Sequence, residues 1–534
     1  MGKNIFLTGS GRLAAMRQVV SRAEWGAAAA STLLLIFSFP NFELYFLAWI
    51  ALVPLLVAIA RRPSPLAAFL LGWATGSVFF YATCYWLTYS MIHYGGVPTV
   101  LAYLLLIPGA LVVGVFHGLF TLLTALAIRK WGVMAVLFAP AFWTSFEWIR
   151  LGVTGQLWNA LGYSQAYHSF LIQSAVWGGV YTVSFLIVVI NSIVALLITS
   201  RTRWTIAAAS VMFLAVVFVM LDAPLEGKFL DSISDGIIVN VVAVQPNVPM
   251  KAVKSVEETK ELLDRHFTLS TTALRTIPRK ERPTIVVWPE SPMNFSYGSD
   301  RALQELLANF TSQNHTSLLI NSLEPAPADG AYNSALLINE EGRLISQYDK
   351  IRLMPFGEYV PLPQWLPGAS LITGIVGEFT PGDKYTLMPF GDRQAGVFIC
   401  IESAYPWIAR RLTSEGANVL INISNDGYLG PTAVMRQHLA NAIFRAVENG
   451  RPVLRVTNTG LSASIDEQGR VRDLTSPFQA DMRFWANHPS ERRDTFYTQH
   501  GDLFVQICAV ITLIVFLTGF TRFSGLNKIS YDHG

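Results

Sequence analysis

Hydrophobic residues fall into eight long runs separated by short polar segments, at residues 25–40, 44–60, 65–90, 98–128, 133–149, 170–200, 204–221 and 503–520. A helix needs about 20 mostly apolar residues to span a bilayer. A buried core helix explains one such run but not a series of them. The pattern therefore predicts a polytopic α-helical membrane domain of about eight spans, seven before a long polar segment and one after it.

The polar segment between the last two runs, residues 235–490, has the pattern of a separate globular domain. Short β-rich runs occur at residues 236–244, 284–288, 317–321, 335–339, 396–398, 419–423, 453–457 and 462–465. Helix-forming stretches at residues 256–277, 300–312 and 432–449 lie between them. This alternation predicts an α/β domain with helices covering a sheet. The expected order is a tail (1–23), a seven-span membrane domain (24–222), the α/β domain (235–490), an eighth span (502–521) and a second tail (522–534).

Basic residues of the short connections predict the orientation, because Lys and Arg collect on the cytoplasmic side of a membrane. Twelve lie in alternate connections: Lys3, Arg12, Arg17, Arg22, Arg61, Arg62, Arg129, Lys130, Arg201, Arg203, Arg522 and Lys528. The opposite connections hold only Arg150. Both tails are therefore expected in the cytoplasm and the α/β domain on the far side, which is the periplasm in a Gram-negative bacterium.

Composition excludes several classes of protein. Only 14% of the residues are charged, against about 25% in soluble proteins, so a cytosolic enzyme is nearly excluded. A net charge of +3 spread over 534 residues creates no positive electrostatic field strong enough to attract nucleic acid, so no nucleic-acid partner is expected. No His-rich or Cys-rich spacing and no phosphate-binding glycine loop occurs, so neither a metal nor another cofactor is implied. His438 lies within a predicted helix without a Ser or Cys partner at a readable spacing.

Three polar residues follow apolar strands and precede turn-forming residues: Glu290, Lys350 and Cys400. Reactive groups just past strand ends converge on one crevice in open α/β sheets. Each residue alone also fits a plain structural role, as a turn carboxylate, a solvated lysine or a small buried thiol. The order of the three residues and the sequence motifs around them decide between these interpretations.

These motifs are Trp-Pro-Glu at residues 288–290, Tyr-Asp-Lys at 348–350, Pro-Phe-Gly-Glu-Tyr-Val-Pro at 355–361 and Cys-Ile-Glu at 400–402. They resemble the nitrilase (carbon-nitrogen hydrolase) superfamily, and with the apolar runs the whole chain resembles bacterial apolipoprotein N-acyltransferases. The resemblance implies an αββα sandwich, with Glu290 as general base, Lys350 as the cation beside the oxyanion and Cys400 as nucleophile. It also implies phosphatidylethanolamine as acyl donor and the α-amino group of a diacylglyceryl-cysteine as acceptor.

The chemistry of the three residues supports these roles independently. Only a thiolate attacks, and a free thiol has a pKa of about 8.5, so Cys400 needs a cation or a base nearby. Lys350 and Glu290 supply one of each. An ammonium and a backbone N–H, expected to be that of Ile401, can stabilise the oxyanion.

Further residues match family positions. Glu358 is expected to orient Lys350, with a loop-capping carboxylate as the alternative, and Glu402 and Asn333 are expected to be supporting hydrogen-bonding residues. Asn425 and Tyr428 should rim the pocket. The chain departs from the family pattern at Ile401, where an aromatic residue is usual, at Tyr428-Leu429, where Trp-Phe is usual, and at Lys254, where a Trp is usual.

Two other functions compete with acyl transfer. One is a membrane-tethered amidase or nitrilase, in which water resolves the thioester. The other is a transporter with a binding domain, which the near absence of charges inside the spans disfavours. Access to lipid explains both the spans and the triad. The apolar residues Leu353, Met354, Phe356, Trp365, Leu366 and Leu371 are expected to receive an acyl chain, or else to be ordinary core.

Overall fold

The computed structural model describes residues 20–40, 42–155, 157–229, 237–250, 254–277, 282–327, 330–355, 357–359, 379–487 and 494–520. The predicted tails, apart from residues 20–23, lie outside these ranges, as do Phe356, Trp365, Leu366 and Leu371. The chain divides into two compact units. The helical unit comprises Met1–Gln165, Val180–Asp222 and Asp502–Gly534, and the α/β unit comprises Ala166–Gly179 and Ala223–Gly501.

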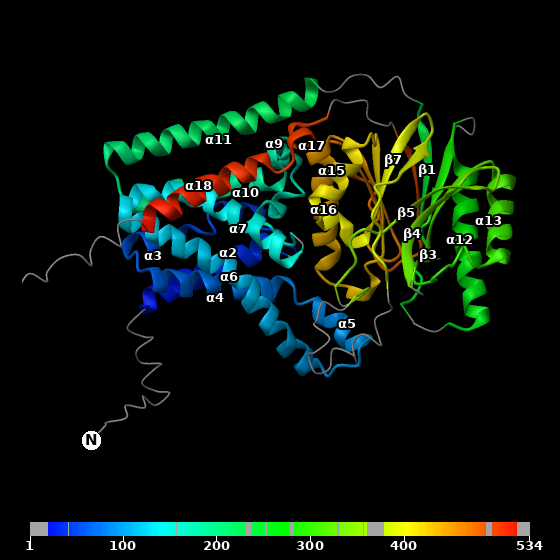
Figure 1. Ribbon diagram of the computed structural model, residues 1–534, viewed down its shortest axis with the longest axis horizontal. Helices are drawn as coiled ribbons and strands as arrows, with labels where there is room; N and C mark the ends of the chain where they lie inside the picture. The colour runs from blue at the N-terminus through cyan, green and yellow to red at the C-terminus, as the bar shows by residue number, and fades with distance from the viewer. Residues whose placement is uncertain are drawn as a thin grey trace, which may run out of the picture. The chain divides into compact units, whose positions relative to one another are not determined.

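The helical unit is built from helices of the N-terminal part of the chain together with the C-terminal helix α18 (Figure 1). Its elements are α2 (Arg22–Ser38), η1 (Tyr45–Trp49), α3 (Val53–Arg61), α4 (Pro65–Thr83), α5 (Leu87–His93), α6 (Thr99–Trp131), η2 (Val133–Phe138), α7 (Ala139–Thr154), η3 (Leu161–Gln165), α10 (Val180–Thr199), α11 (Arg203–Phe229) and α18 (Leu503–Phe520). The first helix begins at a capping box, in which Ser21 and Glu24 each bind the other's backbone N–H.

Four helices in the described ranges are long and apolar enough to cross a membrane: Pro65–Thr83, Thr99–Trp131, Val180–Thr199 and Arg203–Leu221. The apolar stretches Tyr45–Arg61 and Leu503–Gly519 are shorter. Several predicted runs are broken in the structure. Residues 65–90 divide after Thr83, residues 133–149 divide into η2 and α7, and residues 170–200 contain two single-turn helices before α10. A run of hydrophobic residues indicates only that the segment lies in apolar surroundings. Short helices joined by buried turns therefore give the same hydrophobic run as one continuous helix.

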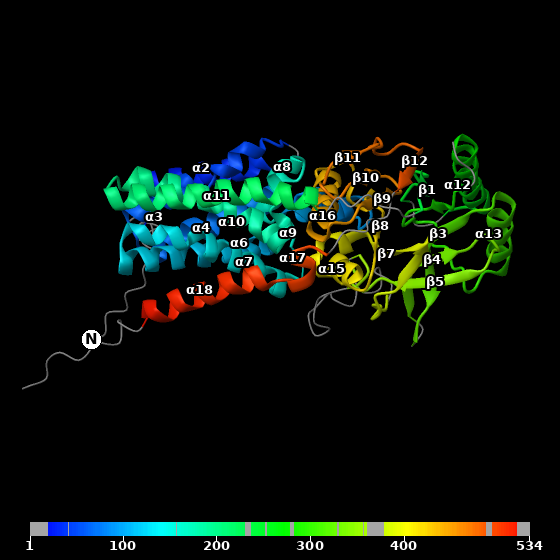
Figure 2. The same ribbon diagram turned by 90° about the horizontal axis from the view of Figure 1, so that it is seen from above.

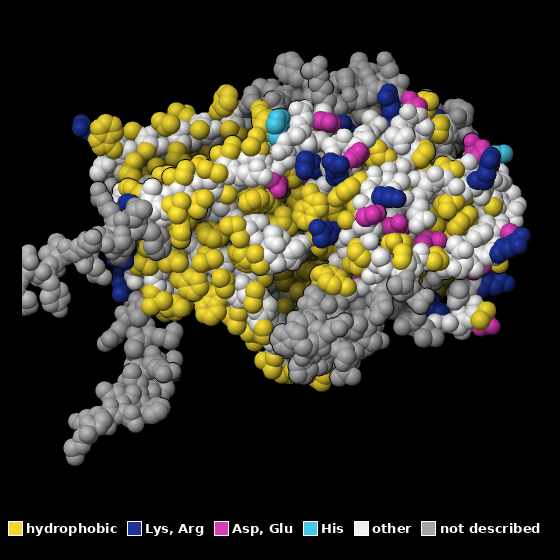
Figure 3. Space-filling model, viewed as in Figure 1, with side chains coloured by type: hydrophobic (Ala, Val, Ile, Leu, Met, Phe, Trp, Pro, Cys, Tyr) yellow, Lys and Arg dark blue, Asp and Glu magenta, His cyan; other side chains and the backbone are white. Residues whose placement is uncertain are grey.

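Exposed side chains of the helical unit are largely hydrophobic. On the face shown in Figure 3, yellow side chains dominate this unit, whereas charged side chains are scattered over the α/β unit. Trp204, Val211 and Phe218 of α11 are each about two-thirds exposed, and Ile507 and Leu513 of α18 are more than half exposed. Helices with so much apolar surface fit a lipid environment.

The α/β unit contains two six-stranded sheets, ordered β12-β1-β2-β3-β4-β5 and β11-β10-β9-β8-β7-β6. The first comprises β1 (Val239–Gln245), β2 (Thr284–Val287), β3 (Ser317–Pro325), β4 (Ala331–Ile338), β5 (Leu344–Asp349) and β12 (Asp481–Asn487). The second comprises β6 (Leu387–Phe390), β7 (Arg393–Ile399), β8 (Val419–Ser424), β9 (Val453–Thr457), β10 (Ala463–Ile465) and β11 (Val471–Arg472). Each sheet has three central parallel strands, β1-β2-β3 and β7-β8-β9, with antiparallel strands outside them.

Helices cover the outer face of each sheet, which gives the predicted αββα sandwich (Figures 1 and 2). Helices α12 (Val256–Thr276) and α13 (Arg301–Asn314) cover the first sheet, and α15 (Pro406–Ser414) and α16 (Val434–Asn449) cover the second. The inner faces of the sheets form one buried cluster that includes Val241, Val287, Val397 and Ile421. Parallel strands buried on both faces account for the short, continuously apolar runs in the sequence.

A short stretch that overlaps the start of the sixth predicted span belongs to the α/β unit. Residues 166–179 carry the single-turn helices α8 (Ser169–Ile172) and α9 (Ala175–Gly178). Gln173 Nε2 donates to the main-chain oxygen of Gln468 at 2.9 Å, and the Tyr167 hydroxyl donates to that of Arg436 at 2.7 Å. The rings of Trp177 and Phe496, in α17 (Phe496–His500), lie 5.9 Å apart. Ile172, Ala175 and Val176 of this stretch are buried, whereas Phe170 is 54% exposed.

Candidate active site

Strand ends of both sheets carry the three predicted catalytic residues. Glu290 lies three residues beyond β2, and a bond from Trp288 N to Leu319 O extends the pairing toward it. Lys350 follows β5 directly, and its N–H donates to Asn333 O at 2.8 Å. Cys400 is the first residue after β7. The sequence correctly places all three residues at strand ends.

Lys350 lies between two carboxylates. Its Nζ is 3.3 Å from Glu290 Oε1 and 2.8 Å from Glu358 Oε2, and its side chain is only 1% exposed. Asn333 Nδ2 donates to both carboxylates, at 2.9 Å to Glu290 and 2.7 Å to Glu358. Asn321 in turn donates to Asn333 Oδ1 at 2.7 Å. This network fixes the positions of one cation and two anions.

Burial alone would lower the pKa of the Lys350 ammonium, but Glu290 and Glu358 outweigh it and raise this pKa well above its ordinary value. Lys350 therefore remains charged. The Glu358 carboxylate also accepts from Met354 N at 2.7 Å, so it holds its own loop as well as Lys350. Both the orienting role and the loop-capping role expected of Glu358 correspond to contacts in the structure.

Cys400 is buried and adopts a left-handed backbone conformation, with φ of 51°. Burial raises the pKa of its thiol, and the charge of Glu290 raises it further. Lys350 and a main-chain hydrogen bond with Asn425 act in the opposite direction without overcoming this shift. The resting thiol is therefore protonated, and attack requires a base.

Glu402 connects the nucleophile's turn to the strand that carries Lys350. It is fully buried, and its carboxylate accepts from Ile351 N and Ile399 N, each at 2.7 Å. It also accepts from Arg352 N at 3.0 Å and from the Tyr348 hydroxyl at 2.9 Å. Its contacts are those of the supporting hydrogen-bonding residue that the sequence predicts.

The remaining predicted positions differ in exposure. Ile401 and Asn425 are buried, whereas Tyr428 is 46% exposed. Asn425 Oδ1 accepts from Gly427 N at 3.1 Å and from Asn458 at 3.3 Å. Lys254 donates to Pro292 O at 2.9 Å. Within the described ranges, no three His, Cys, Asp or Glu side chains are grouped as a metal site.

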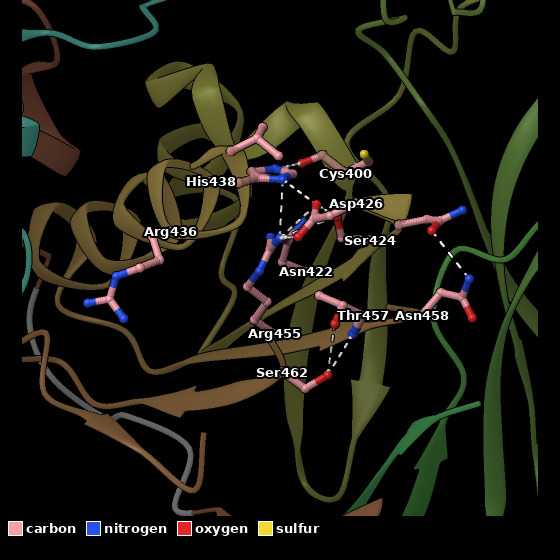
Figure 4. Close-up of polar contacts among 12 residues, drawn as sticks. Cys400, Asn422, Ser424, Asp426, Arg436, His438, Arg455, Thr457, Asn458 and Ser462 are labelled. Atoms are coloured by element: carbon pink, nitrogen blue, oxygen red, sulfur yellow. Dashed lines mark hydrogen bonds and ion pairs between the residues drawn. The ribbon is translucent and has the colours of Figure 1, made fainter. Parts of the chain in front are cut away.

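Sequence reasoning missed His438, Asp426 and Arg455. The sequence offers no Ser or Cys partner for His438 at a readable spacing, and in the structure its Nε2 lies 2.9 Å from the main-chain oxygen of Cys400 (Figure 4). The contact joins α16 to the turn that follows β7 and involves a backbone atom. No residue spacing could indicate it.

Comparison with known proteins accounts for both units. Residues 243–482 match the carbon-nitrogen hydrolase family, so the α/β unit is a nitrilase-fold domain. Residues 31–193 match the apolipoprotein N-acyltransferase N-terminal domain. The apolipoprotein N-acyltransferase of Geobacter metallireducens is 30% identical over 515 residues, covering 94% of this chain and 96% of the relative. That of Allorhizobium ampelinum is 31% identical over 431 residues, covering 76% and 77%. The chain therefore belongs to the apolipoprotein N-acyltransferase family.

Solved structures of the nitrilase superfamily are also similar. Nit3 of Saccharomyces cerevisiae, a member of branch 10 of that superfamily, covers 50% of this chain and 95% of its own length, with 20% identity and a TM-score of 0.37. An amidase from Nesterenkonia sp. AN1 covers 51% of this chain and 97% of its own length, with 15% identity and a TM-score of 0.37.

Proposed function

We propose that the protein transfers an acyl chain from a phospholipid, through a thioester on Cys400, to the α-amino group of the N-terminal diacylglyceryl-cysteine of apolipoproteins. The relatives named above support lipoprotein N-acylation. The observation that carries the mechanism is the hydrogen-bonded set of Glu290, Lys350, Glu358 and Asn333. Glu290 and Lys350 lie just past strand ends, as Cys400 does.

In the first half-reaction, Glu290 takes the proton of the Cys400 thiol as sulfur attacks the ester carbonyl. This transfer leaves the net charge of the buried site unchanged, because one anion replaces another beside Lys350. The oxyanion is stabilised by the Lys350 ammonium and the Ile401 N–H. The bond from the acyl carbon to the glycerol oxygen then breaks, and Glu290 returns its proton to that oxygen. The products are a thioester and a lysophospholipid.

In the second half-reaction, the α-amino group attacks the thioester carbonyl. Glu290 takes a proton from the attacking nitrogen and passes it to the departing Cys400 sulfur, which restores the thiol. One base thus serves both steps. Water must be kept from the thioester, and the acyl chain itself covers the pocket. Leu353 is buried beside the catalytic turn and is one candidate contact for the chain.

We also propose an acyl donor, a membrane topology and residues at the rim of the pocket. Phosphatidylethanolamine is the proposed donor, by family resemblance. The chain is proposed to cross the bacterial inner membrane about eight times, with the α/β unit in the periplasm. The distribution of basic residues among the short connections supports this orientation. Asn425 and Tyr428 are proposed to rim the pocket.

The test is a comparison of products. Purified protein is incubated with labelled phosphatidylethanolamine and a diacylated lipopeptide, and N-acylated peptide is compared with free fatty acid. We expect the acylated peptide to predominate and an acyl adduct to appear on Cys400 by mass spectrometry. Cys400→Ala should lose both, whereas Cys84→Ala and Cys508→Ala serve as matched controls and retain them. Free fatty acid with unmodified peptide would instead support the membrane-tethered hydrolase.

A further inference from the structure

Three buried side chains form a chain of contacts that ends on the backbone of the nucleophile (Figure 4). His438 Nε2 lies 2.9 Å from Cys400 O, and His438 Nδ1 lies 2.7 Å from Asp426 Oδ1. Arg455 Nη2 lies 2.9 Å from Asp426 Oδ2. The exposed fractions of His438, Asp426 and Arg455 are 2%, 1% and 0%. The three residues come from α16, the loop after β8, and β9, so the contacts tie three elements to one peptide.

The direction of the contact with Cys400 follows from its chemistry. A carbonyl oxygen only accepts hydrogen bonds, so His438 Nε2 carries the hydrogen and donates it. The Asp426 carboxylate also only accepts, so His438 Nδ1 donates to it, and the two hydrogen bonds fix the orientation of the ring. Burial alone would raise the pKa of Asp426, but Arg455 and His438 outweigh it and hold this pKa well below its ordinary value. The histidine therefore contacts a fixed carboxylate. Arg455 Nη2 donates to both oxygens of that carboxylate and lies 3.1 Å from His438 Nδ1.

The Cys400 carbonyl and the Ile401 N–H belong to the same planar peptide unit. In a trans peptide these two groups point in opposite directions, so holding the oxygen also aims the N–H. A hydrogen bond to the oxygen polarises the unit and strengthens the N–H as a donor. His438 therefore acts on the proposed oxyanion donor through the peptide, without touching the substrate.

The conformation of Cys400 requires such a restraint. A non-glycine residue with φ of 51° is strained and persists only where the surrounding structure determines it. Glu402 holds the residue before Cys400 through Ile399 N, and Arg445 Nη1 holds the Ser403 carbonyl at 2.9 Å. His438 holds the carbonyl of Cys400 itself.

We propose that His438, fixed by Asp426 and Arg455, is a positioning residue that aims and polarises the Cys400–Ile401 peptide toward the oxyanion of acyl transfer. The inference rests on the proposed function, because the oxyanion forms only when Cys400 attacks an acyl carbonyl. If His438 acts in this way, its loss should affect two reactions of the Cys400 thiol differently. Acylation passes through an oxyanion, whereas alkylation by iodoacetamide does not.

The experiment measures both rates in His438→Leu and His438→Gln, in a background of Cys84→Ala and Cys508→Ala. In His438→Leu we expect single-turnover acylation by phosphatidylethanolamine to fall about 10-fold to 100-fold, less than the loss on removing a whole oxyanion donor. Alkylation and KM for the lipid should stay within about 3-fold. The side-chain amide of His438→Gln can still donate to the carbonyl and should recover part of the acylation rate.

His266→Gln is the matched control. His266 is a fully buried histidine of α12 whose Nδ1 also lies 2.7 Å from a main-chain oxygen, that of Leu262. It should leave both rates within about 3-fold. If His438→Leu does not fold, His438→Asn gives the same comparison, because its amide is too short to reach the carbonyl. Unchanged acylation, or an equal fall in both rates, overturns the inference alone. A parent enzyme that forms no acyl adduct overturns the proposed function and the inference together.

Discussion

At the scale of single residues, the central feature is a buried lysine held between two carboxylates. Removing a buried cation from such a pair leaves uncompensated charge, which is far more costly than losing a surface ion pair. In the proposed mechanism the same ammonium also faces the oxyanion. Its loss should therefore act on catalysis and on local order together.

Lys350→Met keeps most of the side-chain volume and removes the charge. We expect kcat for acylation to fall by about 10³-fold, the upper range for loss of one oxyanion-stabilising group. The control is Lys260→Met, at an exposed lysine of α12, which should retain full activity. Single-turnover acylation by labelled phospholipid measures both variants. A Lys350→Met enzyme within 10-fold of wild type would remove Lys350 from the oxyanion role.

The state of the Cys400 thiol gives a prediction about pH. Because burial and Glu290 raise its pKa, the thiolate fraction is small at neutral pH and grows as pH increases. In a variant with Cys84→Ala and Cys508→Ala, the rate of alkylation by iodoacetamide should rise about tenfold per pH unit from about pH 7 to 9.5. An ordinary thiol levels off near its pKa of about 8.5. A plateau at or below about pH 9 would contradict the prediction.

Residue-level chemistry was readable from the sequence only where it depends on side chains at strand ends. Glu290 and Cys400 each follow a short apolar strand, so their convergence is predictable from the fold. Lys350 follows β5, a mostly exposed or half-buried strand that the sequence pattern did not predict. The contact of His438 with the Cys400 carbonyl depends on the relative rotation of a helix and a strand. That rotation is set by packing, which leaves no pattern in the sequence.

At the scale of elements, strands buried on both faces were predicted best. The run at residues 453–457 is confirmed as β9, and residues 419–423 differ from β8 by one residue. The sequence analysis did not predict β5, β6, β11 or β12. Strand β12 has four half-buried residues among its seven and pairs only with β1, so its composition is mixed. Edge strands have one exposed side and lack the continuous apolar run that marks central strands.

Gly179 offers a test of how residues 166–179 join the α/β unit. Its backbone has φ of 67° and ψ of −162°, which only glycine adopts readily, and an added Cβ would lie 3.0 Å from the Tyr497 ring. Gly179→Ala should lower the free energy of unfolding by about 1–3 kcal/mol. Gly152→Ala is the control, because a Cβ there meets nothing within 4 Å. Thermal unfolding in detergent measures both, and equal midpoints would contradict the prediction.

At the scale of the whole molecule, the sequence indicated two environments for one chain, and the structure has two compact units. Hydropathy alone did not separate membrane helices from buried ones. Residues 170–179 belong to an apolar run predicted to span the membrane, yet the structure assigns them to the α/β unit. An apolar run indicates that a segment is excluded from water. Both a lipid bilayer and a protein core exclude water, so hydropathy does not distinguish between them.

Basic residues in the short connections predict how the chain is oriented in the membrane. Twelve basic residues in alternate connections place those connections in the cytoplasm, and the α/β unit then lies on the opposite side. Alkaline phosphatase fused near Gln313 in α13 should be active, because that enzyme needs an oxidising compartment to form its disulfides. The same reporter fused after Arg129, at the end of α6, should be inactive. Green fluorescent protein at the two sites should give the reverse result. An active phosphatase after Arg129, or none near Gln313, would invert the proposed topology and place Cys400 where no exported lipoprotein can reach it.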